Sequence, residues 1–385
     1  MPKLRIILAA LTALTLFASC TSYDQLQKER ASRAKKGKGD IYIAAVWAKK
    51  LFKSFYFEGL AMAVDEINRK GGINGRRLRT VSFYNDTASV DRDLEIAGEI
   101  ARDCRLVAVL GHYDDDGAIM ASVPYEYSGI LYLAPACTNP MFTQHGFKYI
   151  FRNTPSDEVN GADCAKFLKN RGFGKITVLD DRTPYGKMFA DYFSAYAAKI
   201  GLKVVGRRSF NRWTSDFKGI FAEVKALDGD GIFLGASLPQ AGAVIKQARI
   251  MGIKAPFIGG NSINSPTLWD LAGEAAAGTL THTVFNPEER SVLVQRFTRD
   301  FYARHHDYPD TWAAQGYDGI MVLAHIFKKS GTTLPLVVGS HLRFLENWEG
   351  VTGKYSFARS GDIVGKINSF QVLQQGKYRH LEVVE

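Results

Sequence analysis

From Ile41 onward, the chain alternates short apolar runs with longer segments in which apolar residues recur at helical spacing. The run DIYIAAVW predicts a strand, and FYFEGLAMAVDEINRKGG follows it with an apolar face and a pair of glycines that ends the helix. Strand and helix units continue through RRLRTVSFYND, VDRDLEIAGEIARDC, RLVAVLGH, GILYLAPACTNP, KITVLDDRTPYG, GLKVVGRRSF, GIFLGAS and APFIGGN. This alternation predicts an α/β fold built on parallel sheets.

Each predicted strand ends in a polar or glycine-rich loop, and in open α/β sheets the loops at the carboxyl ends of the strands form the ligand crevice. The third strand is followed by Asp114, Asp115 and Asp116 in a row. One of the first two should cap the next helix, because free backbone amides and the helix dipole favour a carboxylate there. Since a cap needs only one carboxylate, the others either face solvent or receive a cationic or hydroxyl-rich ligand.

The first residues are typical of an export signal. Lys3 and Arg5 precede IILAALTALTLFA, an apolar stretch too short to span a bilayer as a finished helix. The stretch ends in LFASC, which resembles a bacterial lipoprotein signal that is cleaved before a cysteine that becomes lipidated. We therefore expect residues 1–19 to be a removed signal and Cys20 to carry lipid. The alternative is ordinary secretory cleavage, with Cys20 an incidental thiol.

Residues 20–40 are polar, rich in lysine and arginine, and without periodic apolar residues, which predicts a solvated, lipid-anchored tether. Part of the formal net charge of +10 falls on this tether and on the first residues. No basic stripe with interleaved aromatic residues follows, so nucleic-acid binding is not indicated. A basic tether beside a lipid anchor can lie near anionic headgroups. With 385 residues, 46% of them hydrophobic, the chain is long enough for two or three domains with cores.

Candidate catalytic and metal-binding motifs are incomplete. GGINGRR follows a predicted helix and GFGK precedes its strand, so neither is a dinucleotide or phosphate loop. GASLP lacks the second glycine of a nucleophile elbow, and HHD at residues 305–307 has no spaced partner histidines. Cys104, Cys137 and Cys164 allow at most one disulfide between them. The sequence therefore predicts a protein that is not an enzyme and that needs no cofactor or metal.

Six ordered segments resemble the leucine/isoleucine/valine-binding protein family, the type I periplasmic binding proteins that feed ABC importers. They are GLAMAVDEINRKGGINGRRL, APACTNPMFTQHGFKYIFRNTPSD, VLDDRTPYGK, WTSDFKGIFAEVKALDGDGIFLG, AGEAAAGTLTHTVFNP and AAQGYDGIMVLAHIFKKSG. The resemblance implies two lobes, each a three-layer α/β sandwich with a parallel sheet, joined by three hinge crossovers. Lobe one would hold residues 41–152 plus 285–367, and lobe two would hold residues 153–284 plus 368–385.

The resemblance also implies where a ligand would bind. In the family, the carboxylate of an amino-acid ligand is held by a hydroxyl at the tip of the third strand and by the Ala-Thr-Asn-Pro turn, which correspond to Asp115 and to Ala136 and Thr138 here. The alternative role of Thr138 is to cap the next element. Tyr185 lies in the family's Tyr-Gly turn and would stack on the ligand, unless it is a core or surface tyrosine.

Three departures from the family fall on the chemistry of amino-acid recognition. The strand-tip hydroxyl is replaced by Asp115, the acidic residue that receives the ligand's ammonium falls near Asn261, and the glycine-rich first loop is replaced by WAKKLFKS, which begins at Trp47. A ligand carboxylate about 4 Å from Asp115 would be repelled by roughly 4 kcal/mol at an effective dielectric of 20. We therefore expect no tight binding of leucine, isoleucine or valine, unless lysines of the first loop fold inward.

These observations predict a solute-binding lipoprotein of the periplasm or cell envelope, attached to the membrane only through its lipid anchor. It would deliver a small polar molecule, amino-acid-like or another metabolite, to the permease of an ABC importer. Two alternatives remain open from the sequence: a ligand-sensing protein for a membrane receptor, and an envelope scaffold with a vestigial cleft. The identity of the solute stays open as well.

Overall fold

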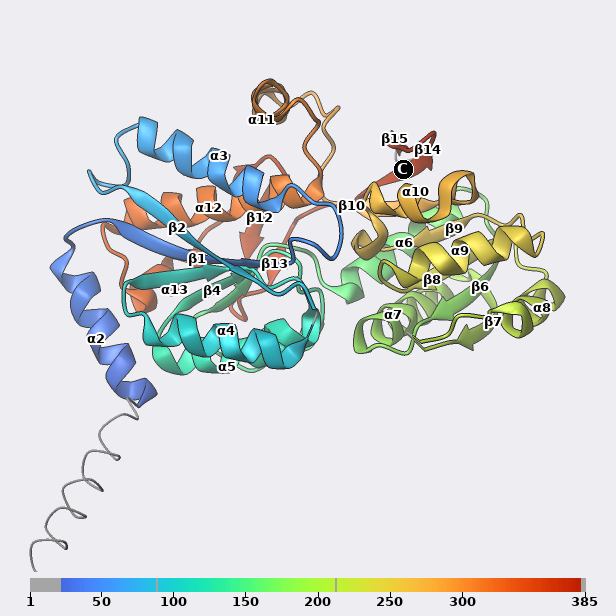
Figure 1. The fold of residues 1–385 in the computed structure, drawn as a ribbon, viewed down its shortest axis with the longest axis horizontal. Helices are drawn as coiled ribbons and strands as arrows, with labels where there is room; N and C mark the ends of the chain where they lie inside the picture. Colours follow the sequence, from blue (N-terminus) through green and yellow to red (C-terminus); the bar gives the residue numbers. More distant parts are fainter. Residues whose placement is uncertain (1–21, 88, 212, 382–385) are drawn as a thin grey trace, which may run out of the picture.

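The first lobe is built on a parallel sheet in the strand order β2-β1-β3-β4-β5 (Figure 1). The computed structural model describes residues 22–87, 89–211 and 213–381. The strands are β1 (Ile41–Trp47), β2 (Leu78–Tyr84), β3 (Leu106–Leu110), β4 (Leu131–Ala134) and β5 (Ile150–Arg152). β3 and β4 are buried along their whole length, because helices cover both faces of a parallel sheet.

Helices on both faces make this lobe a three-layer sandwich. One face carries α3 (Tyr56–Arg69), α12 (Thr311–Ser330) and α13 (Pro335–Arg343), and the other carries α4 (Val90–Arg102) and α5 (Asp115–Ser128). A further helix, α11 (Val292–His305), packs on the α3 and α12 layer. Helices α3 and α12 lie very close together, because a Cβ at Gly59 would be 2.0 Å from the Ala313 carbonyl oxygen. The contact therefore requires glycine at position 59.

The second lobe repeats this architecture on a sheet in the order β15-β14-β10-β9-β8-β6-β7. Its strands are β6 (Lys175–Asp180), β7 (Lys203–Ser209), β8 (Gly231–Gly235), β9 (Phe257–Gly259), β10 (Leu280–Thr283), β14 (Ser369–Gln374) and β15 (Lys377–Leu381). Helices α6 (Asp157–Asn170) and α7 (Pro184–Ile200) pack on one face, and α8 (Lys218–Leu227), α9 (Gln240–Ile250) and α10 (Thr267–Ala272) pack on the other. Both lobes are three-layer α/β sandwiches, as the sequence predicts.

One edge of the second sheet is antiparallel. β14 runs antiparallel to β10, and β15 runs antiparallel to β14. The second of these pairings follows from the tight hairpin between the last two strands, in which Gln375 (φ 49°) and Gly376 (φ 74°) both adopt left-handed backbone conformations. Such turns join antiparallel neighbours. The predicted parallel sheets are confirmed, and the sheet of lobe two carries an antiparallel edge in addition.

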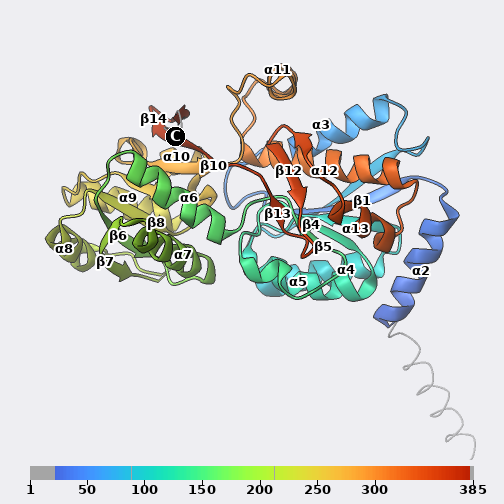
Figure 2. The same ribbon diagram turned by 180° about the vertical axis from the view of Figure 1, so that it is seen from behind.

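The chain passes between the lobes after β5, after β10 and before β14. Between α13 and β14 it forms a small antiparallel sheet from β11 (Trp348–Gly350), β12 (Gly353–Phe357) and β13 (Ile363–Val364). Figure 2 shows β12 and β13 on the side of lobe one, with the following chain running across to lobe two. Short 3-10 helices at Pro140–Thr143, Asn261–Ile263 and Gly273–Ala276 complete the described elements.

The segment expected to be a solvated tether instead contains a helix packed on lobe one. Helix α2 (Tyr23–Lys36) is capped by the Ser22 side chain, and it buries Leu26, Arg30 and Ala34. These residues are spaced four apart, so they form one stripe on the helix. The sequence prediction missed this stripe because its central member is an arginine and most of its neighbours are charged.

The cationic side chain of Arg30 can be buried between α2 and lobe one because backbone carbonyl oxygens accept its hydrogen bonds. Its guanidinium donates to the carbonyl oxygens of Leu106 (2.8 Å), Ala101 (2.9 Å) and Asp103 (3.3 Å), and to that of Ser128. Burial lowers its pKa to about 10, which leaves it charged at neutral pH. Helix α2 is therefore fixed to the lobe by hydrogen bonds as well as by apolar contact.

Cys104, Cys137 and Cys164 are buried and form no disulfide in the described part of the chain. No described helix combines the length and the hydrophobicity that crossing a bilayer requires. Residues 1–19 and Cys20, which the sequence assigns to a signal and a lipid anchor, lie outside the described residues.

Candidate functional site between the lobes

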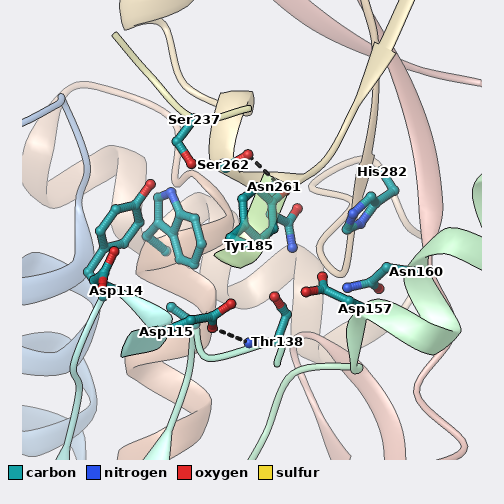
Figure 3. Close-up of a pocket in the computed structure, with 13 residues that line it drawn as sticks. Asp114, Asp115, Thr138, Asp157, Asn160, Tyr185, Ser237, Asn261, Ser262 and His282 are labelled. Carbon is teal, nitrogen blue, oxygen red and sulfur yellow. Dashed lines mark hydrogen bonds between the residues drawn. The ribbon is translucent and has the colours of Figure 1, made fainter. Parts of the chain in front are cut away.

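A pocket lies between the lobes, at the carboxyl ends of strands from both sheets (Figure 3). Lobe one lines it with Tyr113, Asp114, Asp115, Ala136, Thr138 and Trp312, and lobe two lines it with Asp157, Asn160, Tyr185, Ser237, Asn261, Ser262 and His282. This is the edge at which open α/β sheets hold ligands.

The loop after β3 positions the first aspartates. Its chain reverses at Gly111, which has a φ of 145° and where a Cβ would lie 2.2 Å from the Val46 carbonyl oxygen. Asp114 then caps α5, accepting hydrogen bonds from the backbone amides of Asp116 (3.1 Å) and Gly117 (3.2 Å). The prediction that one of the first two aspartates caps this helix is confirmed.

Asp115 turns into the pocket. Its side chain is 7% exposed, and its Oδ1 accepts from the backbone amides of Thr138 (2.8 Å) and Asn139 (3.4 Å). Its Oδ2 has no hydrogen-bond partner. Burial raises the pKa of Asp115, while the neighbouring Cys137 thiol, these amides and the charge of Arg152 act against the rise.

Asp157 lies at the start of α6, which Ser156 caps, and Figure 3 shows it across Thr138 from Asp115. Its backbone amide donates to the Thr138 carbonyl oxygen (2.8 Å), and its side chain is 1% exposed. Neither carboxylate oxygen has a hydrogen-bond partner of good geometry. Burial raises the pKa of Asp157 well above its usual range and the charge of Asp115 raises it further, while the Thr138 and Asn160 side chains and the charge of Arg152 act against the rise.

Sequence reasoning missed Asp157 as a site residue. TPSDEV contains an N-cap serine followed by an acidic first turn, which is a common helix start with no functional meaning of its own. A signal was nevertheless available, because the segment directly follows β5 and its carboxyl end joins the other strand ends at the pocket. The proximity to Asp115 depends on the crossover between the lobes, which local patterns do not specify.

Apart from Asp157, the residues that line the pocket from lobe two are uncharged, and they are called the neutral wall below. The Ser262 hydroxyl lies 2.9 Å from both the Tyr185 hydroxyl and the Ala236 carbonyl oxygen and forms hydrogen bonds with them. Asn261 is 7% exposed, and its side-chain oxygen has no partner. Burial lowers the pKa of His282 to about 4, so this imidazole is uncharged at neutral pH.

The structure thus brings Asp115, Ala136, Thr138, Tyr185 and Asn261 to one pocket. Trp47, the sixth residue expected there, lies in the core instead, 1% exposed. Its ring stacks on Tyr56 (centroids 4.1 Å apart), and its Nε1 donates to Ser54 Oγ (3.1 Å). The tryptophan that does line the pocket is Trp312, at the start of α12 and 5.2 Å from Trp47 between ring centroids.

The segment WAKKLFKS, which begins at the end of β1, contacts lobe two, but none of its lysine side chains lines the pocket. The Lys53 backbone bonds to Thr267 Oγ1 (3.0 Å) and Ser265 Oγ (2.9 Å), which belong to lobe two. Its ammonium pairs with Asp307 (3.6 Å), and the amides of Lys49 and Lys50 bind Asp86. Among the thirteen described lining residues, three are aspartates and none is lysine or arginine.

The described residues contain no group of histidine, cysteine, aspartate or glutamate side chains arranged to hold a metal ion. What the pocket offers is a set of desolvated oxygen and nitrogen atoms without partners, on Asp115, Asp157, Asn261 and His282. Buried polar groups cost free energy unless they are hydrogen-bonded. The arrangement is therefore suited to binding a polar molecule between the lobes.

Comparison with known proteins agrees with this architecture. The family model described as periplasmic binding protein matches residues 52–377. The Leu/Ile/Val-binding protein homolog 2 of Brucella abortus is 30% identical over 310 residues, which cover 79% of this chain and 81% of that protein.

Two solved structures extend the comparison. An ABC transporter substrate-binding protein from Desulfitobacterium hafniense, in complex with Leu, has a TM-score of 0.81 and 31% identity, and the match covers 89% of this chain and 100% of that one. A solute-binding protein of an ABC transporter from R. palustris, in complex with benzoate, has a TM-score of 0.76 and 16% identity, over 89% and 96% of the two chains. The second likeness concerns the fold alone.

The resemblance carried by the six sequence segments is thus confirmed by the family match, by a relative at 30% identity and by two-lobed structures of the same fold. The chain belongs to the periplasmic binding protein family and has the type I fold.

Proposed function

We propose that this protein captures a small polar solute in the pocket between its lobes and delivers it to an ABC importer. The observation that carries the proposal is the set of buried polar atoms without partners at the pocket, on Asp115 and Asp157 above all. A bound solute that supplies hydrogen-bond donors would satisfy these atoms and hold the lobes together. A relative that is 31% identical was solved with Leu, which supports an amine-bearing solute here.

The proposed lobes are residues 41–152 plus 285–367 and residues 153–284 plus 368–385. This division is supported by the strands of the two sheets, which fall on either side of the crossovers. Asp115, Ala136 and Thr138 would bind the solute from lobe one, and Tyr185 and Asn261 from lobe two. Because both lobes contribute, solute binding should favour the closed arrangement.

The test is a thermal-shift screen of a broad metabolite library against the purified protein. A solute present at 100 times its dissociation constant stabilises the folded state by about 2.7 kcal/mol. Tyr185→Ala serves as the pocket variant, because its aromatic face lies at the pocket; a true hit should lose about 1–3 kcal/mol of affinity in that variant. A library in which no solute shifts the melting temperature would contradict the proposal.

We also propose that the protein is a lipoprotein of the periplasm or cell envelope, anchored through Cys20. LFASC and the short apolar stretch before it support this. Mass spectrometry of the mature protein should show an acylated Cys20 at the N-terminus and no Met1. Cys20→Ser should release the protein from the membrane fraction. A mature chain that begins elsewhere and lacks lipid would contradict the anchor while leaving solute binding intact.

A further inference from the structure

The three aspartates of the pocket lie along one wall of the pocket in the close-up view. In Figure 3, Asp115 lies between Asp114 and Asp157. Asp115 and Asp157 are more than nine-tenths buried, and each has at least one carboxylate oxygen without a partner. The other two groups with unpartnered atoms, Asn261 and His282, are uncharged at neutral pH. The electrostatic character of the pocket is therefore set by the carboxylates.

The protein itself does not neutralise this wall with a cation in the pocket. Arg152 lies near enough to lower the pKa values of Asp115 and Asp157. Its guanidinium is nevertheless engaged with Asp362 (2.6 and 2.9 Å) and with the Asn139 carbonyl oxygen (2.8 Å). A cationic ligand would supply the missing partner, since a buried carboxylate is stabilised by an opposite charge nearby.

The donors that a ligand carboxylate would need are already engaged. The Thr138 and Asn139 amides donate to Asp115 Oδ1, so the aspartate's own carboxylate lies at these amides. A ligand carboxylate brought to this turn would find these amides used and would face a like charge. The usual anchor for an α-amino acid is thus replaced by a group that attracts cations.

Aromatic rings complete the recognition surface. Tyr113, Trp312 and Tyr185 line the pocket from both lobes. Ring faces attract ammonium groups and pack against methylene chains. The combination of carboxylates and rings suits an organic cation, whereas the described residues contain no cluster arranged to hold a metal ion.

We propose that the pocket binds an organic ammonium ion that carries no carboxylate, with short linear diamines as the preferred class. The inference rests on the proposed solute-binding function and narrows its ligand. Two charged nitrogens joined by a methylene chain would meet carboxylates on either side of Asp115, while the chain would pack on the rings. One ammonium alone would leave part of the carboxylate wall without a partner.

The experiment is isothermal titration calorimetry on the purified protein at pH 8 and low salt, with 1,4-diaminobutane, butylamine, leucine and magnesium chloride as probes. We expect 1,4-diaminobutane to bind at least tenfold more tightly than butylamine and at least a hundredfold more tightly than leucine. Asp115→Asn and Asp157→Asn should each weaken diamine binding at least tenfold. Asp91→Asn, which removes the same charge from an exposed position on α4, should change it less than twofold.

Two further measurements keep the result interpretable. Melting temperatures of the empty variants show whether each is folded, and Asp115→Ser tests the reciprocal effect, since removing the carboxylate should raise leucine affinity at least tenfold. Equal weakening by Asp91→Asn and Asp157→Asn would show a non-specific charge effect and overturn the inference.

The outcomes separate this inference from the proposed function. Leucine, another amino acid or magnesium binding more tightly than the diamine would overturn the inference. So would a library solute without an ammonium group, although solute capture would then stand. If neither the amines nor any library solute binds, the inference and the proposed function both fail.

Discussion

Two buried aspartates of this chain have opposite surroundings. Asp318, on α12, accepts hydrogen bonds from the backbone amides of Val351 (2.9 Å) and Thr352 (2.8 Å) and from the Thr352 hydroxyl. Asp157, at the start of α6, has no hydrogen-bond partner of good geometry on either carboxylate oxygen. Their side chains are 0% and 1% exposed, so burial does not explain the difference.

The comparison separates a structural carboxylate from one available to a ligand. Asp318 joins α12 to the turn between β11 and β12, and the charge of Lys366 together with the bonds that Asp318 accepts offsets the cost of burying its charge. Asp157 bears the same cost at the pocket between the lobes, where Thr138, Asn160 and the charge of Arg152 compensate it only in part. A residue that costs stability in the empty protein is expected where binding requires it.

The largest effect should therefore come from exchanging carboxylate for amide at the two positions. Asp318→Asn keeps the shape but places an amide nitrogen against donors, so we expect a loss of about 3 kcal/mol in the free energy of unfolding. Asp157→Asn replaces a buried carboxyl group that lacks hydrogen-bond partners of good geometry, and it should leave the empty protein equally or more stable. Differential scanning calorimetry of the two variants measures both. Similar losses in both would show that Asp157 is structural and would remove the basis of the comparison.

Arg30 extends the comparison to a buried cation. Its guanidinium donates to backbone carbonyl oxygens between α2 and lobe one, so it resembles Asp318 rather than Asp157. Arg30→Met keeps much of the apolar contact but leaves these carbonyls unpaired. We expect about 2 kcal/mol less protection of the α2 amides in hydrogen exchange, with ligand affinity unchanged.

Lys28→Met is the matched control on the same helix. Lys28 is exposed and pairs only with Asp24 among the described contacts, so its removal should leave the exchange of α2 within a few tenths of a kcal/mol. If Arg30→Met behaved like Lys28→Met, the helix would be held by its apolar stripe alone. If Arg30→Met weakened ligand binding, α2 would be coupled to the pocket.

The sequence predicts those features of the fold and the site that depend on contacts between residues close together in the chain or in neighbouring strands. The α/β architecture could be predicted because strands that are buried on both faces consist of unbroken runs of apolar residues. Asp115 and Thr138 could be placed together because they follow β3 and β4, which are neighbours in the sheet. Helix α2 was missed because Arg30 occupies the centre of its buried stripe, and its carbonyl partners are far away in the chain.

The residues that line the pocket could be predicted only in part, because some of them come together through contacts between distant parts of the chain. Trp47 was expected in the pocket because it begins the segment that replaces the family's glycine-rich first loop, yet it stacks on Tyr56 in the core, and Trp312 lines the pocket instead. Trp312 and Asp157 reach the site through crossovers between the lobes. Whether a buried carboxylate has hydrogen-bond partners depends on such distant contacts, so a local sequence pattern does not predict it.

Asp114 should give a smaller, pH-dependent effect. Burial and the charges of Asp115, Asp116 and Asp93 raise its pKa to about 6, whereas the Gly117 amide opposes the rise. The folded state therefore binds a proton more tightly than the unfolded chain, whose aspartate pKa is about 3.9. The contribution of this proton to stability is complete below the unfolded pKa and is lost as the pH rises through about 6.

Between pH 6.5 and pH 5, the empty protein should consequently gain about 1 kcal/mol relative to Asp114→Asn, which keeps a good helix cap. Affinity for an ammonium ligand should fall over the same range, because protons compete for the carboxylates. Urea unfolding and calorimetry across this range check both slopes. Parallel stability curves for the two proteins would show that Asp114 does not titrate there.

The smallest effect is expected on the neutral wall of lobe two. The Tyr185 hydroxyl and the Ser262 hydroxyl bond to each other, and Ser262 also bonds to the Ala236 carbonyl oxygen. Tyr185→Phe keeps the ring, which packs on Phe189 with centroids 5.7 Å apart, and removes only the hydroxyl. Because hydroxyls of this wall already have partners, we expect a loss of about 0.5–1 kcal/mol in ligand affinity.

Ser262→Ala removes the same bond from the other side, so the double variant should lose little more than either single variant. Additive losses in the double variant would show that the two hydroxyls contact the ligand separately, and the neutral wall would then contribute to recognition as the carboxylate wall does.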